Sequence, residues 1–379
     1  MPDSRVPDSG VPDSGVPDSG AADSGAASGV ADNGCARYSI AADADRCLAS
    51  AAMTIEIREL DPVLPETQET LLPLFQAASA ADMPRHPEPT AGFLRFITGP
   101  RVARHRLCVT AFDGGAPIAF GCLNQDLAAN PDMIFGDIWI LPERRAEAAV
   151  ALLDAFKAHT RRRGAQRMVL GFSEFAAPDY EPVFAAAGGR RVSWERRSQL
   201  DLTTIDREQY AAWAAPSPKN ARYRIQAWTV PTPEHLLAPL VEANDAIRDA
   251  PTGDLRLNHA PPDVERRRAA ETLIVAAGVR KHIIAALTED GEMAGMHEMF
   301  VVPGFRMGDV GNTAVPAKFR GHGLGLRLKA DLALRLLASE PELDVVSTWN
   351  DAGNGPMLRV NEAMGYEKAE AWSNWQFDL

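Results

Sequence analysis

Residues 319–328, FRGHGLGLRL, place three glycines and an arginine directly before a segment with the apolar spacing of a helix. The N-terminus of a helix leaves backbone N–H groups unpaired and carries partial positive charge, so it attracts phosphate. Glycine lets the backbone approach a pyrophosphate where a Cβ would clash, and Arg320 adds a cation. The stretch is therefore either a phosphate-binding loop or a plain glycine-rich turn, and its surroundings must separate the two.

Two common phosphate-binding motifs do not fit the loop. A dinucleotide-binding fold has its glycine loop after the first strand, whereas this loop follows the fourth strand of its unit. A P-loop has Lys and then Ser or Thr after its last glycine, where this chain has Leu326 and Arg327. The loop is of neither type.

The pattern of strands and helices around the loop occurs twice. The order β-α-α-β-β-β-α-β-α-β starts at residue 55 and again at residue 222, with hairpin turns at DGGA (113–116) and EDGE (289–292). We therefore predict an α/β protein with two tandem copies of one domain, 53–203 and 204–379. Each copy is expected to have a mixed, mostly antiparallel sheet flanked by helices.

The first 52 residues differ from the rest of the chain. They contain VPDSG three times within 6–20 and then runs of Ala, Asp, Ser and Gly. Such a composition cannot bury enough apolar surface to offset chain entropy. We predict a disordered tail over 1–52, with folded structure starting at Met53.

Charge, hydropathy and cysteine spacing exclude several classes of protein. The net charge is −12 with no block rich in Lys or Arg, which argues against nucleic acid as a partner. No window approaches the ~20 apolar residues of a membrane span. The four cysteines (35, 47, 108 and 122) show no CxxC spacing, so we expect reduced thiols, no zinc site or other metal site, and a cytoplasmic protein.

The loop and its neighbours resemble a known superfamily. A three-strand meander, then strand, [RQ]-x-x-G-x-[GA] and helix, is similar to the acyl-CoA-binding motif of the GNAT acyltransferases. NDAGNGPMLRVNEAMGY (350–366) resembles their second motif. The resemblance covers nearly all of 222–379 and extends to the tandem two-domain GNAT proteins of high-GC bacteria, some of which are encoded in antibiotic-biosynthesis clusters. It rests also on APTGDL (250–255), ERRRAAE (265–271) and GEMAGMHEM (291–299).

This resemblance implies an N-acyltransferase that moves an acyl group from acetyl-CoA, or another acyl-CoA, directly to a small amine. It also implies which residues hold the acyl-CoA. The loop would bind the pyrophosphate, the strand before it would pair with the pantetheine amides, and three asparagines would border the pantetheine arm. These residues are Arg320, Gly321, His322, Gly323, Leu324 and Gly325; Thr313, Ala314 and Val315; and Asn350, Asn354 and Asn361. Asn354 has a second interpretation, as a plain helix N-cap.

Acyl transfer to an amine also needs a general base. Glu298, in the segment AGMHEM, is the first candidate, with substrate binding as its alternative role. Asp249 and Asp254 are the next candidates for the base; they lie in the segment that would cover the acceptor and are also expected to bind it. Many GNAT enzymes use a tyrosine at the position of Asn361 as general acid for the thiol. Because an amide cannot donate that proton, the general acid stays unassigned.

The first copy has lost the glycine loop. Its equivalent segment reads IWILPERRAEAAVALLDAF, with two arginines but no glycine between residues 138 and 159. We expect this copy to be structural or to complete the acceptor cleft, the alternative being a tightly bound CoA without turnover. Two other functions stay open for the whole chain, an acyl-CoA sensor with lapsed catalysis and a protein acetyltransferase. We expect a monomer or homodimer.

Overall fold

The computed structural model describes residues 55–61 and 63–379, which belong to one compact unit. The predicted disordered tail, 1–52, lies outside the described residues. None of the helices in the described ranges has the length and apolar character that crossing a bilayer requires.

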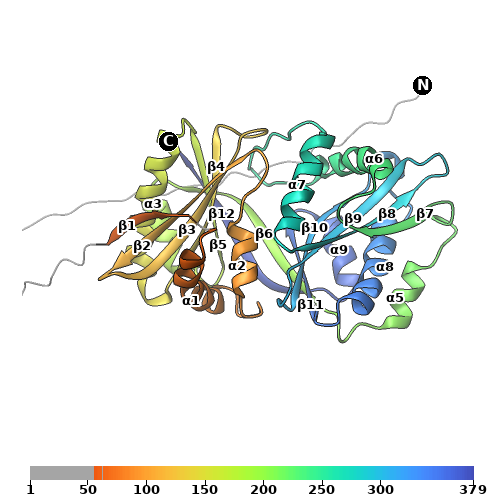
Figure 1. Ribbon diagram of the computed structural model, residues 1–379, viewed down its shortest axis with the longest axis horizontal. Coiled ribbons are helices and arrows are strands. Elements are labelled where there is room, and N and C mark those ends of the chain that lie inside the picture. Colours follow the sequence, from red (N-terminus) through yellow and green to blue (C-terminus); the bar gives the residue numbers. More distant parts are fainter. Residues whose placement is uncertain (1–54, 62) are drawn as a thin grey trace, which may run out of the picture. The chain divides into compact units, whose positions relative to one another are not determined.

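The elements follow one another in the predicted order, with one additional helix, α5, between the two repeats (Figure 1). The strands are β1 Glu56–Leu60, β2 Arg104–Asp113, β3 Ala116–Asp126, β4 Met133–Ile140, β5 Arg167–Ser173, β6 Arg190–Asp201, β7 Arg224–Thr229, β8 Arg280–Leu287, β9 Met293–Val301, β10 Met307–Ala314, β11 Val345–Asp351 and β12 Glu367–Asp378. The α-helices are α1 Pro65–Asp82, α2 Ala91–Thr98, α3 Arg145–Arg162, α4 Ala177–Ala186, α5 Arg207–Ala214, α6 Glu234–Asn244, α7 Val264–Ala276, α8 Leu324–Ser339 and α9 Gly355–Ala363. Short 3₁₀ turns are η1 Pro142–Arg144, η2 Asp245–Asp249 and η3 Ala317–Phe319.

Two short helices, α2 and α5, fall outside the segments read as helical in the sequence. Thr90 caps α2 by accepting a hydrogen bond from the N–H of Phe93, and Asp206 caps α5 by accepting from Glu208 and Gln209. Both residue types are preferred helix N-caps. The start signals were present, but each helix is only 8 residues long, too short for a periodic pattern to stand out.

All twelve described strands form one sheet in the order β1-β2-β3-β4-β5-β12-β6-β11-β10-β9-β8-β7. The neighbours are antiparallel except for two parallel pairs, β4 with β5 and β10 with β11. The last strand of the chain, β12, inserts between β5 and β6, while β6 pairs with β11 (Figure 1). Each half of the sheet therefore includes the last strand of the other sequence repeat: β6 pairs with β11, and β12 pairs with β5. The predicted boundary at 203/204 did not include this exchange of strands.

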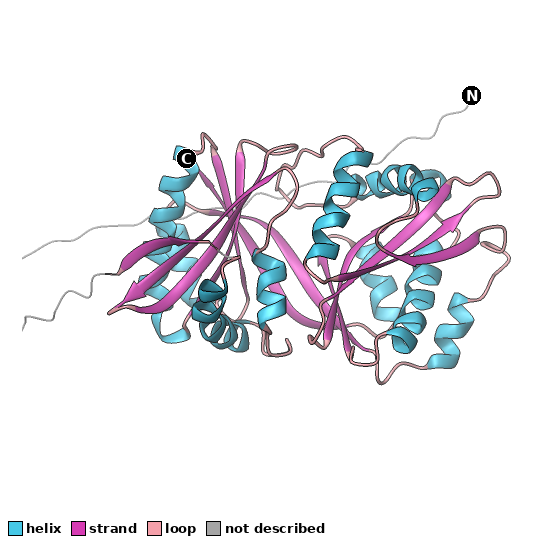
Figure 2. Ribbon diagram, in the orientation of Figure 1, coloured by secondary structure: helices cyan, strands magenta, loops and turns pink. Residues whose placement is uncertain are grey.

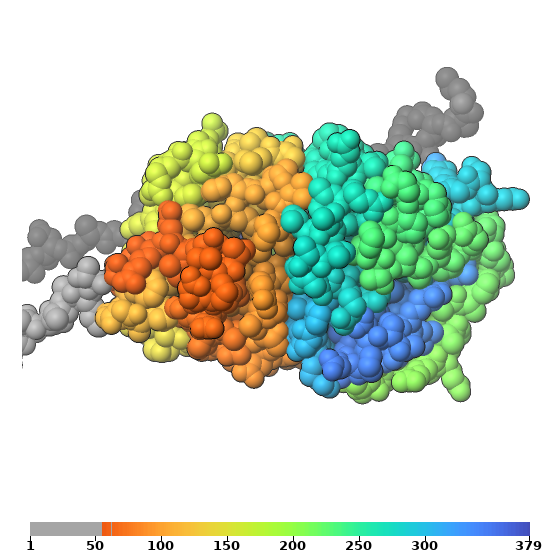
Figure 3. All heavy atoms as spheres, in the orientation of Figure 1, coloured from red at the N-terminus to blue at the C-terminus, as the bar shows by residue number. Residues whose placement is uncertain are grey.

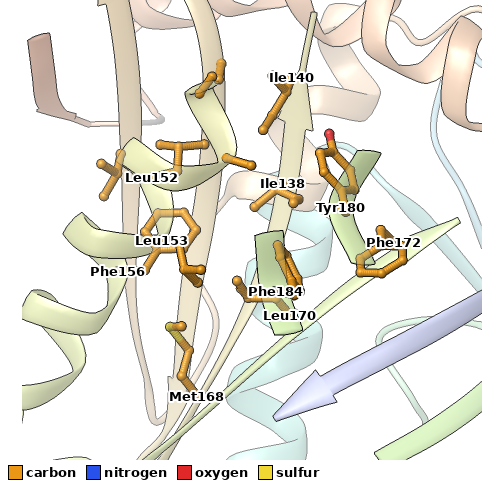
Figure 4. Packing of buried hydrophobic residues seen from close by; sticks show 14 of the residues in the cluster. Ile138, Ile140, Leu152, Leu153, Phe156, Met168, Leu170, Phe172, Tyr180 and Phe184 are labelled. Atoms are coloured by element: carbon orange, nitrogen blue, oxygen red, sulfur yellow. The ribbon is translucent and has the colours of Figure 1, made fainter. Parts of the chain in front are cut away.

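Helices cover both faces of the sheet (Figure 2). In the second half, α8 packs on β8 and β9 with a stripe of leucines, and α6 packs on the opposite face. In the first half, α3 and α4 enclose an aromatic core that includes Phe156, Phe172, Tyr180 and Phe184 (Figure 4). These layers hold β10 and β11, the strands nearest the glycine loop, between two packed faces.

The expectation of reduced thiols is wrong for two of the four cysteines. Cys108 on β2 and Cys122 on β3 are joined in a disulfide, with their Cα atoms 4.4 Å apart. The antiparallel pairing of β2 with β3 places the two residues directly opposite each other. Spacing along the chain carried no signal because strand pairing, and not a motif, brings them together.

Candidate functional site

The two parallel strands β10 and β11 separate near the middle of their length. Their pairing runs from Met307–Val345 to Asp309–Ser347 and then stops, although β10 continues to Ala314 and β11 to Asp351. The pairing of β10 with β9 also shifts register between Val310 and Thr313. Backbone N–H and C=O groups beyond the divergence therefore have no sheet partner on one side and can pair with an extended ligand.

The glycine loop lies at the open end of this divergence. After η3, residues 320–323 lead into α8, whose N-cap is Gly323. Gly321 and Gly323 have φ of +81° and +73°, a left-handed conformation that favours glycine. An added Cβ at Gly325 would meet nothing within 4 Å. The first turn of α8 therefore presents unpaired N–H groups to open space, as a phosphate site requires.

One cavity of about 940 Å³ connects the loop and the diverging strands. Ten of the twelve residues predicted to hold an acyl-CoA line it: Thr313, Ala314, Val315, Arg320, Gly321, Gly323, Leu324, Gly325, Asn350 and Asn354. The first half of the chain contributes to the wall as well, through Phe135, Asp137, Ser193 and Glu195, and β12 contributes Asn374. The glycine cradle, the unpaired strand edges and the cavity volume fit a phosphorylated, extended ligand such as an acyl-CoA.

His322 does not line this cavity. Its Nδ1 lies 2.8 Å from the hydroxyl of Tyr223, and its backbone carbonyl accepts a hydrogen bond from Asn220. Arg320 is ion-paired with Asp249 and also donates to the carbonyl of Val315. The geometry therefore gives His322 the task of anchoring the loop, and it places Asp249 at the phosphate end of the cavity.

The three predicted asparagines have different surroundings. Asn354 accepts a hydrogen bond from the N–H of Met357 and caps α9, the second interpretation given above, while also lining the cavity. Asn361 is buried, donates to Asn350 Oδ1 over 2.8 Å and accepts from Lys329 Nζ over 2.7 Å. Asn361 thus links β11, α8 and α9 behind the cavity wall.

Glu298 lies beside Gly311 of β10, yet it is held in a buried ion pair. Its carboxylate is 2.8 Å from Lys281 Nζ and 3.0 Å from Arg267. Although burial alone would raise its pKa, these two cations lower the pKa of Glu298 to about 2. A carboxylate with so low a pKa accepts protons poorly near neutral pH, so the geometry does not favour the predicted role as general base.

Asp309 is a carboxylate that the sequence reasoning missed. It is the last residue of β10 that pairs with β11, and it lines a second cavity of about 860 Å³. Burial raises its pKa to about 6, partly opposed by Arg197. The feature of the sequence that could have indicated Asp309 is that it is the single acidic residue among the apolar and small residues of MGDVG (307–311). A carboxylate with this pKa at the divergence can accept a proton at neutral pH.

The second cavity meets the first at Val310 and Ile247. Cationic side chains outnumber acidic ones in its wall: Arg95, Arg101, Arg104, Arg248, Arg266, Arg267 and Lys281 against Asp126, Asp245, Asp263 and Asp309. Within the described residues, Arg95, Arg101 and Arg266 have no carboxylate partner. These three arginines therefore present unneutralised positive charge to this cavity, despite the negative net charge of the chain.

The segment 250–263, which follows η2, contacts residues of the first half of the chain (Figure 3). The N–H of Asp254 donates to the carbonyl of Val192, and Asn258 exchanges two hydrogen bonds with Asn130. Asp254 is exposed and lines neither cavity, so the geometry does not support its predicted contact with the acceptor.

The equivalent place in the first half is built differently. There η1 ends at Arg144 and α3 begins at Arg145, so the four-residue loop of the second half has no counterpart. Arg144 pairs with Asp113 and Glu147, and Arg145 pairs with Asp82 and Asp179. The two arginines that might attract a phosphate are thus neutralised by carboxylates, and neither lines the two cavities.

Solved structures share this architecture. A tandem GNAT protein from the clavulanic acid biosynthesis pathway is 24% identical with a TM-score of 0.72, covering 86% of this chain and 98% of its own. A GCN5-related N-acetyltransferase from Sphaerobacter thermophilus is 16% identical with a TM-score of 0.59, covering 85% and 95%. N-myristoyltransferase from Saccharomyces cerevisiae, solved with myristoyl-CoA, is 11% identical with a TM-score of 0.53, covering 86% and 80%. No protein-family model matches the sequence, and no curated protein matches it. The chain therefore has the tandem GNAT fold.

Proposed function

We propose that this protein is an acyl-CoA-dependent N-acyltransferase that acts on a small amine. The observation that supports this most is the single cavity that joins the glycine loop to the divergence of β10 and β11. Acetyl-CoA, or another acyl-CoA, would supply an activated acyl thioester. The N–H groups of 321–326 would hold its pyrophosphate, and the free edges of β10 and β11 would pair with its amides.

Asp309 acts as the general base in this proposal. The amine must lose a proton as it forms the new amide bond, and Asp309 lines the second cavity next to Val310, which lines both cavities. Its raised pKa, about 6, lets the carboxylate hold that proton near neutral pH. Glu298 instead keeps Lys281 and Arg267 paired beneath the strand.

The acceptor would enter through the second cavity. Because Arg95, Arg101 and Arg266 lack carboxylate partners there, the acceptor is an amine that also carries a carboxylate or another anionic group. An amino acid or an acidic antibiotic precursor has this chemistry. A place in antibiotic biosynthesis or resistance rests on the sequence resemblance alone.

The test is native mass spectrometry of the full chain with acetyl-CoA, using Gly325→Trp and a matched control, Ala146→Trp. Gly325 is the second residue of α8 and faces open space, and exposed Ala146 is the second residue of α3 in the other half. We expect Gly325→Trp to lose the adduct and Ala146→Trp to keep it. Loss in Ala146→Trp alone would assign the ligand to the first half, and no adduct in any variant would reject the proposal.

The alternative function is an acyl-CoA sensor without catalysis. A turnover assay distinguishes it from the proposed enzyme. The enzyme releases free CoA thiol when acetyl-CoA is mixed with anionic amines, whereas a sensor binds acetyl-CoA and releases none.

A further inference from the structure

Lys329 is a buried cation with an incomplete set of partners. It lies on α8, is 2% exposed, and its Nζ donates to Asn361 Oδ1 over 2.7 Å. Across the described residues it has no carboxylate within ion-pairing distance, and the ring of Tyr366 lies 5.2 Å from its Nζ. An ammonium has three N–H donors. A single neutral acceptor and one aromatic ring therefore leave part of its charge and its donors unmatched, which is costly in a buried position.

Its side chain belongs to the wall of the predicted acyl-CoA cavity. The groups that face it come from three neighbouring segments: His297 on β9, Asn361 on α9 and Tyr366 before β12. His297 is kept neutral, because burial lowers its pKa to about 3, and burial raises the pKa of Tyr366, so that it too is neutral. Lys329 is thus the cation that this part of the wall presents to a bound ligand.

The fold gives Lys329 this place through its spacing on α8. Leu324, Leu328 and Leu332 form the buried stripe of the helix, and Lys329 follows Leu328 on the side that faces α9. There Asn361, which stands where many GNAT enzymes have a tyrosine, is held by Asn350 and in turn holds Lys329. The amide cannot supply a proton, but the ammonium bonded to it can.

We infer that Lys329 stabilises the negative charge on the sulfur of coenzyme A and protonates that sulfur when the acyl group leaves. The inference rests on the proposed function. As the new C–N bond forms, the C–S bond breaks and its electron pair stays on sulfur. The sulfur takes one proton from the Lys329 ammonium, and Asp309 holds the proton lost by the amine. Exchange with water then restores both side chains. Burial lowers the pKa of Lys329 to about 7, so the ammonium is present near neutral pH and can release its proton.

The experiment measures ionisation of the thiol in bound coenzyme A, and so does not depend on the acceptor. The full chain is saturated with CoA, and thiolate absorbance is followed against pH for the unchanged protein, Lys329→Met, Lys329→Arg and Lys318→Met. Lys318 is an exposed cation on η3, paired with Glu292, and serves as the matched control. Acetyl-CoA, which has no thiol, reports whether each variant still binds the ligand.

We expect the thiol of bound CoA to ionise at least one pH unit below the ~8.5 of a free thiol. Lys329→Met should abolish this shift, Lys329→Arg should keep part of it, and Lys318→Met should keep all of it. An unshifted thiol in the unchanged protein, or an equal shift in Lys329→Met with acetyl-CoA still bound, would overturn the inference and leave the proposed function standing. If Lys329→Met does not fold, the outcome is decided by the unchanged protein and Lys329→Arg. Failure of the unchanged protein to bind either ligand would reject the proposed function itself.

Discussion

Asp309 and Ser347 are the last residues that pair β10 with β11, and the strands separate immediately beyond them. Asp309 therefore occupies the closed end of the opening in the sheet and lines the arginine-lined cavity, while the next residue, Val310, lines both cavities. In the proposed function, this carboxylate of raised pKa is the base that accepts the proton of the amine. Several measurable consequences depend on it.

Asp309→Asn should lower kcat/KM by about 10²–10⁴-fold, because it removes the proposed base. The rate of the unchanged enzyme should rise with pH through about 6, as Asp309 ionises, and this limb should be absent in the variant. Burial disfavours the ionised form, so its cost to stability is present above pH 6 and is relieved as the pH falls toward 3.8. At pH 8 the variant should thus be more stable than the unchanged protein, by at most about 3 kcal/mol. At pH 5 this gain in stability should be smaller. A normal rate in Asp309→Asn would exclude it as the base.

Glu298→Gln should act on stability. Removing the carboxylate leaves Lys281 and Arg267 without their shared partner, which should cost about 3–5 kcal/mol. Because the folded pKa of Glu298 is about 2, its stabilising effect is fully present above about 4.5 and is lost as the pH falls toward 2. Denaturant unfolding at pH 7 checks this. An intact unfolding free energy together with a large loss of kcat would return Glu298 to the role of base.

Tyr223→Phe should weaken acetyl-CoA binding several-fold, although Tyr223 does not line the cavity that would hold the ligand. The hydroxyl of Tyr223 bonds His322 and so fixes the backbone of the glycine loop. Losing that bond costs on the order of 1 kcal/mol. We expect this cost to appear as a less ordered loop and therefore as weaker binding. Calorimetric titration with acetyl-CoA measures the change, and Tyr210→Phe, whose hydroxyl bonds the carbonyl of Met364, is the control. Equal affinity in Tyr223→Phe and the unchanged protein would show that the loop needs no anchor.

Arg266→Ala should raise the KM for anionic amines and leave the KM for acetyl-CoA unchanged. Arg266 lines the second cavity and has no carboxylate partner among the described side chains. A charge-assisted contact of this kind contributes about 1.5–3 kcal/mol, or roughly 10- to 100-fold in KM. The KM for amines that carry no anionic group should change little, and these amines provide the control within the same assay. A preference for cationic amines would contradict the proposed acceptor class.

Residues 204–379 should not fold as a soluble monomer when expressed alone. In that fragment β11 lacks its partner β6, and β12 lacks both β5 and β6, so long strand edges are exposed. Size-exclusion chromatography and circular dichroism should show aggregation or partial folding, whereas residues 53–379 should be monomeric or dimeric and cooperative. A well-folded fragment monomer would mean that the exchange of strands is dispensable.

The sequence by itself determined the repeated order of elements, the loop and its helix, because each is set by local chemistry. Periodicity marks strands and helices, and Gly321 and Gly323 adopt backbone angles that other residues avoid. Tertiary structure alone decided the rest. The exchange of β6 and β12, the Cys108–Cys122 bond, and the contrast between ion-paired Glu298 and buried Asp309 all depend on contacts that only the folded chain makes. A carboxylate's proton affinity is fixed by burial and by neighbouring charges, and neither is known until the chain has folded.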